Sequence, residues 1–137
     1  MTSLKIKLLP GWKPVSNPGG PATYTRGTSA NEAALQFSVG SYKHGMLPHT
    51  SGERLIAMCE KLGSKVKDGR VVSRSSGECA FGSYGTVVIE GASPAHFQAW
   101  VVSNKTDFIL ITHVSPSKVD PKEAEEAHEI ALMTSYQ

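Results

Sequence analysis

Apolar residues recur at two different spacings along the chain, and each spacing predicts one kind of element. Every second residue is apolar in several short stretches, which is typical of a strand with one buried face. These stretches are residues 4–8, 33–39, 85–90, 95–103 and 106–114. The last of them is apolar on both faces, because Ile109 and Ile111 alternate with Phe108 and Leu110. It is therefore predicted to lie at the centre of a sheet, with layers packed on both sides.

Two further segments show the spacing of three and four residues that is typical of an amphipathic helix. The first begins after Thr50 or Ser51, either of which can cap it, and ends at Gly63. Its apolar stripe consists of Leu55, Ile56, Cys59 and Leu62. The second begins with a capping Asp120 followed by Pro121, and its stripe consists of Ala124, Ala127, Ile130 and Ala131. The pattern thus predicts one helix in the middle of the chain and one at its end.

The connecting segments are marked by proline and glycine. Residues 10–31 hold several of each and are predicted to form a long irregular segment, attached to the body by Trp12 and Tyr24. Asp68 and Gly69 predict a hairpin turn between weak strands near residues 66 and 71–72. Residues 73–78 are polar and expected to be exposed, and residues 79–81 are expected to be strand.

Size and charge narrow the class of protein. The chain has 137 residues and a formal net charge of +2, which indicate a single domain over residues 1–137 without the clustered basic face that nucleic acid requires. Lysines interrupt the apolar residues near the N-terminus, so no secretory signal is predicted, and no apolar run is long enough to span a membrane. We therefore expect a cytoplasmic protein, with no membrane contact and with its two cysteines as free thiols.

Five segments carry a resemblance to a known fold family. They are residues 11–13 (Gly-Trp-Lys), 34–39 (Ala-Leu-Gln-Phe-Ser-Val), 53–62 (Glu-Arg-Leu-Ile-Ala-Met-Cys-Glu-Lys-Leu), 99–102 (Ala-Trp-Val-Val) and 107–112 (Asp-Phe-Ile-Leu-Ile-Thr). Their order resembles that of the photosystem PsbP subunits, the bacterial DcrB lipoproteins and the Mog-type Ran-binding protein. The resemblance implies an α+β fold, a twisted antiparallel sheet sandwiched by two or more helices, and a binding or scaffolding role. The matching residues are packing residues, so the resemblance assigns no site.

Side chains that carry chemistry are few and scattered. His44 and His49 share one loop, but no acid or thiol adjoins them to complete a zinc site, so neither a metal nor a cofactor is expected. No neighbouring cation in the sequence activates Cys79, and no catalytic residue is assigned. The alternative to a binding protein is a small enzyme whose site forms only in the folded sheet, from His96 or His113 with Cys79 or an acid.

The loop between the second strand and the first helix is the most suggestive surface. It combines an aromatic, a cation, two imidazoles and an apolar tip, which suits recognition of a partner. The candidate partner-binding residues are Tyr42, Lys43, His44, Met46 and His49. A second interpretation stays open, in which Met46 and Leu47 pack into the core.

A run of positive residues follows the first helix. It consists of Lys61, Lys65, Lys67, Arg70 and Arg74. It contains no aromatic residue for stacking on bases, so we interpret it as a solvated sheet edge that resists pairing with other sheets. The sequence as a whole favours a non-enzymatic protein-binding or adaptor module, for example an immunity or accessory protein of a bacterial toxin or secretion system. A homodimer is a further expectation.

Overall fold

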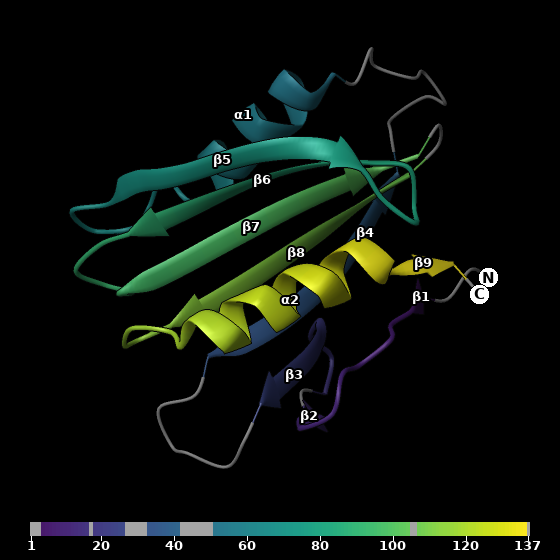
Figure 1. The fold of residues 1–137 in the computed structure, drawn as a ribbon, viewed down its shortest axis with the longest axis horizontal. Helices are drawn as coiled ribbons and strands as arrows, with labels where there is room; N and C mark the ends of the chain where they lie inside the picture. Colours follow the sequence, from purple (N-terminus) through teal and green to yellow (C-terminus); the bar gives the residue numbers. More distant parts are fainter. Residues whose placement is uncertain (1–3, 17, 27–32, 42–50, 105–106, 137) are drawn as a thin grey trace.

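A computed structural model of the chain describes residues 4–16, 18–26, 33–41, 51–104 and 107–136. This part of the chain forms two helices and an extended sheet, whose arrangement can be followed in Figure 1. The elements are β1 (Leu4–Lys5), β2 (Trp12–Val15), β3 (Ala22–Arg26), β4 (Ala34–Ser41), α1 (Gly52–Leu62), β5 (Arg70–Glu78), β6 (Ser83–Glu90), β7 (His96–Ser103), β8 (Asp107–Ser115), α2 (Pro121–Met133) and β9 (Ser135–Tyr136). The predicted α+β class is confirmed.

The main sheet is antiparallel throughout, with strand order β2-β3-β4-β8-β7-β6-β5. β8 is its middle strand, paired with β4 on one side and β7 on the other, as the apolar pattern of residues 106–114 predicted. β1 and β9 form a separate two-stranded sheet that joins the two ends of the described chain. β5 is an edge strand and is almost entirely exposed, which confirms the predicted position of Arg70 and Arg74.

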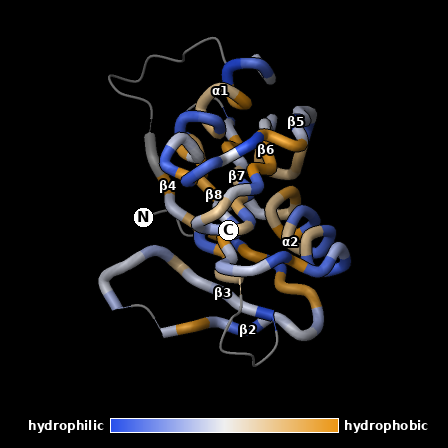
Figure 2. The backbone as a smooth tube through the Cα atoms, turned by 90° about the vertical axis from the view of Figure 1, so that its left-hand side faces the viewer, coloured by the Kyte–Doolittle hydropathy of each residue, from blue (hydrophilic) through white to orange (hydrophobic). Residues whose placement is uncertain are grey.

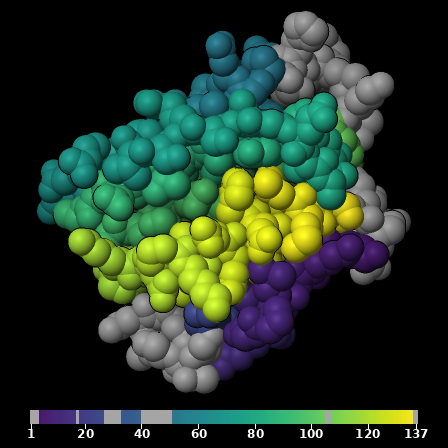
Figure 3. Space-filling view, viewed as in Figure 1, coloured from purple at the N-terminus to yellow at the C-terminus, as the bar shows by residue number. Residues whose placement is uncertain are grey.

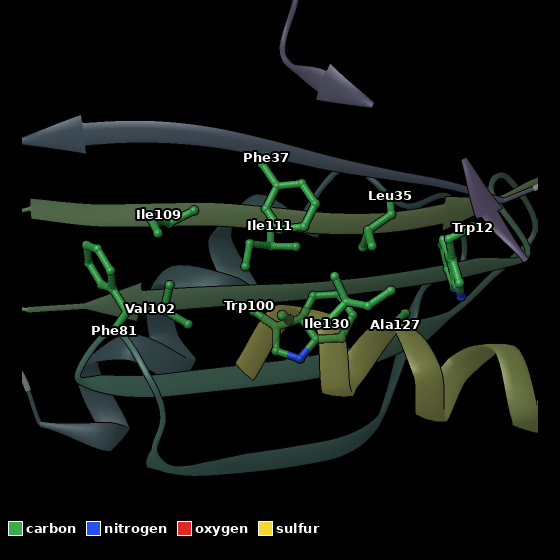
Figure 4. Packing of buried hydrophobic residues seen from close by; sticks show 11 residues of the cluster. Trp12, Leu35, Phe37, Phe81, Trp100, Val102, Ile109, Ile111, Ala127 and Ile130 are labelled. Carbon is green, nitrogen blue, oxygen red and sulfur yellow. The ribbon is translucent and has the colours of Figure 1, made fainter. Parts of the chain in front are cut away.

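The two faces of this sheet carry two separate apolar clusters. On one face, called the α2 face, buried sheet residues pack against α2: Leu35, Phe37, Trp100, Val102, Ile109 and Ile111 (Figure 4). On the other, called the α1 face, Val87, Ile89, Phe97, Ala99 and Val101 pack with Leu55 and Cys59 of α1. Hydrophobic stretches of the trace run through the interior strands, and others lie on α1 and beside β2 (Figure 2). Alternate residues of one strand therefore serve different layers.

Both helices begin as predicted. The Ser51 side chain accepts a hydrogen bond from the Arg54 amide at the start of α1, and Asp120 accepts one from the Lys122 amide at the start of α2. α1 lies so close to β6 that a Cβ atom added to Gly85 would meet Leu55 at 2.6 Å. The Cys59 thiol donates a hydrogen bond to the Gly85 carbonyl across this contact.

Several sequence-based boundaries were wrong. Residues 10–31 hold a hairpin, β2–β3, instead of a fully irregular segment, since Pro14 sits on an edge strand that tolerates a missing donor. Residues 79–81 form a turn closed by Cys79 and Gly82. Asp68 and Gly69 do form a turn, but the segment before it bridges to Ser93 and makes no hairpin with β5.

The N-terminal segment keeps its predicted burial pattern but little of its predicted strand. Only Leu4 and Lys5 are paired, although the apolar residues up to Leu9 pack against the α2 face and the lysines are exposed. Trp12 is buried in the same cluster and Tyr24 packs at its edge, as predicted. Figure 3 shows this segment alongside α2 on the near side of the molecule. Neither described helix has the length and apolar character needed to cross a membrane.

Candidate functional site

The α1 face is only partly covered by its helix. α1 packs on β5, β6 and β7, while the same face continues across β8 and β4. Phe108 and Leu110 of β8 point to this face and remain half-buried. Their neighbours on the opposite face, Ile109 and Ile111, are fully buried. One strand at the centre of the sheet is thus closed on one side and partly open on the other.

A groove of about 570 Å³ lies between α1 and this open part of β8. It is lined by Met58, Lys61, Leu62, Lys65, Phe108 and Leu110. Met58 and Leu62 are one helical turn apart and form a ridge along the side of α1. Leu62 is 39% exposed, which is high for a leucine beside a core. The groove therefore has apolar walls on the helix side and on the sheet side.

The charge of the groove has one sign. Lys61 and Lys65 are exposed and contribute the charged side chains of the lining, and none of the described residues that line the groove is acidic. Lys61 lies in the last turn of α1, near the negative end of the helix dipole. The groove therefore has an apolar floor, formed by Phe108 and Leu110 of β8, and a positive rim, formed by Lys61 and Lys65.

The α2 face holds a different feature, a cluster of polar side chains sealed inside the molecule. His113 is fully buried, and its Nε2 lies 2.9 Å from the Glu123 carboxylate in the first turn of α2. The His113 ring also meets the rings of Trp12, at 6.0 Å, and His96, at 5.5 Å. Within the described structure, His96 Nε2 and His113 Nδ1 are buried without a hydrogen-bond partner.

His96 lies beside a small cavity of about 310 Å³ at the end of β6 and β7, lined also by Glu90 and Lys118. Burial, together with the neighbouring His113, lowers the pKa of His96 from 6.5 to about 4. Its imidazole is therefore neutral at physiological pH. A neutral histidine that is 8% exposed has little access to a substrate.

His128 lies on α2 and is half-buried. Its Nδ1 accepts a hydrogen bond of 3.0 Å from the Trp100 indole, and its ring meets Tyr84 edge-on. Burial lowers the pKa of His128. The residue fixes the orientation of Trp100 in the core, which is a packing role.

The pairing of Cys79 with a histidine is not assembled, whereas a histidine and an acid do meet, in the pair of the buried His113 and Glu123. Cys79 lies beside the start of β6, where Ala80 bonds to Leu132 near the end of α2, whereas His96 lies opposite Glu90 at the end of β6. Because a strand rises about 3.3 Å per residue, the length of β6 places Cys79 and His96 roughly 20 Å apart. The other thiol, Cys59, is fully buried, and burial raises its pKa to about 12. Within the described ranges, no three histidine, cysteine or acidic residues are arranged to hold a metal ion.

The predicted partner-binding residues, Tyr42, Lys43, His44, Met46 and His49, lie outside the described residues. The segment they belong to starts after Ser41, which is paired with Asp107 next to Phe108, and ends before the α1 cap at Ser51. The groove itself was missed from the sequence. Its available signal was an i, i+4 pair of apolar residues, Met58 and Leu62, which widens the apolar stripe of α1 toward one side.

Two solved structures share the arrangement of the chain. Neither a protein-family model nor a curated protein sequence matches it. The crystal structure of LpqN, described as involved in cell envelope biogenesis of Mycobacterium tuberculosis, matches with a TM-score of 0.66 and 8% identity, covering 100% of this chain and 84% of that one. The solution structure of cyanobacterial PsbP (CyanoP) from Synechocystis sp. PCC 6803 matches with a TM-score of 0.61 and 12% identity, covering 100% and 94%.

The chain has a PsbP-like fold. This confirms the resemblance expected from the sequence. Because both identities are low, the likeness concerns the fold, and it transfers no residue role to this chain.

Proposed function

We propose that this PsbP-like protein is a non-enzymatic protein-binding module whose docking site is the groove between α1 and β8. The observation that carries the proposal is the partial exposure of Leu62, Phe108 and Leu110, three large apolar side chains that meet at one groove. Contiguous exposed apolar surface costs free energy in water and is typical of interaction sites. A partner that covers the groove recovers this free energy.

The wider setting of the proposal follows from the fold. Helices that pack on a sheet close over it, and here α1 leaves β8 of its own face partly open. We propose an adaptor role in the cytoplasm, with an immunity or accessory protein of a toxin or secretion system as one form of it. LpqN, of similar fold, is described as involved in cell envelope biogenesis, so a role in assembling envelope components is a second form. A homodimer is a further proposal.

Site-specific photocrosslinking tests the docking site. A photoreactive phenylalanine analogue at Leu62, within the groove, is compared with one at Val72, which is 44% exposed on the edge strand β5. In cells that express the chain naturally, we expect a crosslinked product of discrete mass from position 62 and none from position 72. Equal products from both positions, or none from position 62, would contradict the groove as docking site.

A further inference from the structure

We infer that the partner segment in the groove is an amphipathic α-helix with acidic residues beside its apolar stripe. This inference rests on the proposed binding function and adds the secondary structure and the charge of the partner. Three properties of the groove support it: the paired state of its floor, the shape of its helix side and the sign of its charge.

The floor of the groove excludes a partner that binds by adding a strand. Phe108 and Leu110 belong to β8, whose backbone is paired with β4 on one side and β7 on the other. An extended peptide lying over them finds no free backbone groups and buries its own amides without partners. A helix satisfies its amides internally and can place an apolar stripe on such a surface.

The helix side of the groove suits a second helix. Met58 and Leu62 form one ridge of α1, and Lys65 continues the same side in the turn that follows. Helices pack by placing such ridges between the side chains of a neighbour. A helix lying beside α1 also covers the part of β8 that α1 leaves half-buried, so both apolar walls are used at once.

The two lysines at the rim of the groove favour a bound helix of negative charge. Lys61 and Lys65 are exposed, and within the described part of the chain no carboxylate lines the groove beside them. Their ammonium groups favour aspartate or glutamate at the border of the docked helix and disfavour lysine and arginine there. The long lysine side chains can also lay their methylene groups along apolar surface while the charges stay in water.

Selection from a displayed library of random 16-residue peptides tests the inference on the intact protein. We expect enriched peptides to carry apolar residues at i, i+3 or i+4, and i+7, with acidic residues next to them. The Leu62→Glu variant and the double variant Lys61→Glu, Lys65→Glu should each weaken their binding about tenfold or more. Val72→Glu and Lys5→Glu, which introduce the same charge away from the groove, should bind as the wild type does. Binding should weaken further as salt is raised.

The other possible outcomes contradict either the helix inference alone or the docking site as well. Groove-dependent peptides without acidic residues, or with the pattern of a strand, would leave the docking site standing and contradict the helix inference. Binding of oleate or of anionic lipid vesicles that is lost in Leu62→Glu, with no peptide enriched, would assign the groove to an acyl chain. Self-association lost in the same variant would assign it to a second copy of the chain. Peptides insensitive to every groove variant would contradict the docking site itself.

Discussion

The two faces of the sheet are built from the same strands, but the central strand β8 is buried to different extents on them. On the α2 face, Ile109 and Ile111 are fully enclosed by α2 and by the N-terminal segment with Trp12. On the α1 face, their chain neighbours Phe108 and Leu110 stay half-buried, because α1 packs mainly over β5, β6 and β7. The comparison shows that strand pattern alone does not determine burial; the area that the covering helix reaches decides it.

The same contrast separates two kinds of polar group. The α2 face encloses His96, His113 and Gln98 within a packed interior, away from solvent. The charged groups of the groove, Lys61 and Lys65, stand in water, where they are free to meet a ligand. A titratable residue deep in this protein is therefore a weaker indication of function than two ordinary lysines beside an open apolar surface.

The largest difference is expected from truncating neighbouring residues of β8. Ile111→Ala removes a fully buried side chain and should lower the free energy of unfolding by about 2–5 kcal/mol. Leu110→Ala should cost roughly half as much, because that side chain already contacts water in the folded state. Urea unfolding of both variants measures the two values. Equal losses would show that the α1 face is as closed as the α2 face.

Acidification is expected to act through the closed face. The unfolded chain protonates His96 near pH 6.5 and the folded protein only near pH 4, so the unfolded state binds more protons between these values. Stability should therefore fall as the pH drops through this window, by on the order of 3 kcal/mol in all. In the His96→Gln variant, the slope of the unfolding free energy against pH should be smaller by the contribution of one proton. An unchanged slope in denaturation curves of the variant would contradict the burial of His96.

A smaller effect is expected where α2 holds the β2–β3 hairpin. The Glu126 carboxylate accepts hydrogen bonds from the Trp12 indole at 2.9 Å and from Arg26 at 2.8 Å, and the indole bond is the main cause of its lowered pKa. Glu126→Gln keeps the shape but loses the charge, and should cost about 1 kcal/mol of unfolding free energy. Glu125→Gln, on the exposed side of α2, is the matched control and should be neutral. Equal unfolding free energies for the two variants would show that the Glu126 carboxylate does not stabilise the contact between α2 and the hairpin.

The smallest effect is expected within the groove. Leu62→Ser changes an exposed side chain and should alter the unfolding free energy by less than about 0.5 kcal/mol, while it weakens partner binding. Thermal unfolding and crosslinking of the same preparation separate the two effects. A stability loss comparable to that of Ile111→Ala would show that Leu62 belongs to the core.

The sequence predicted those features that depend on local pattern. The two-sided apolar pattern of β8 placed it at the centre of the sheet, and Ser51, Gly63 and Asp120 marked the ends of the helices. The β2–β3 hairpin was missed because its pairing depends on contacts far along the chain, such as that between Trp12 and Glu126. Val39 was expected to be buried with its strand but is 50% exposed.

The groove could not be predicted for the same physical reason. Its existence depends on which strands α1 covers, and this is set by the close approach of α1 to Gly85 on β6. Leu62 and Leu110 look like core residues in the sequence, and only their positions relative to the edge of α1 make them accessible. The predicted partner-binding residues, Tyr42 to His49, remain a prediction.

Methyl NMR with a soluble paramagnetic agent tests the central claim, that β8 is closed on the α2 face and partly open on the α1 face. The agent broadens methyl groups that solvent reaches and leaves enclosed ones sharp. We expect strong broadening of the methyl signals of Met58, Leu62 and Leu110, and none for those of Ile111, Leu35 and Ile130. Equal protection of Leu110 and Ile111, which are adjacent on β8, would contradict this claim.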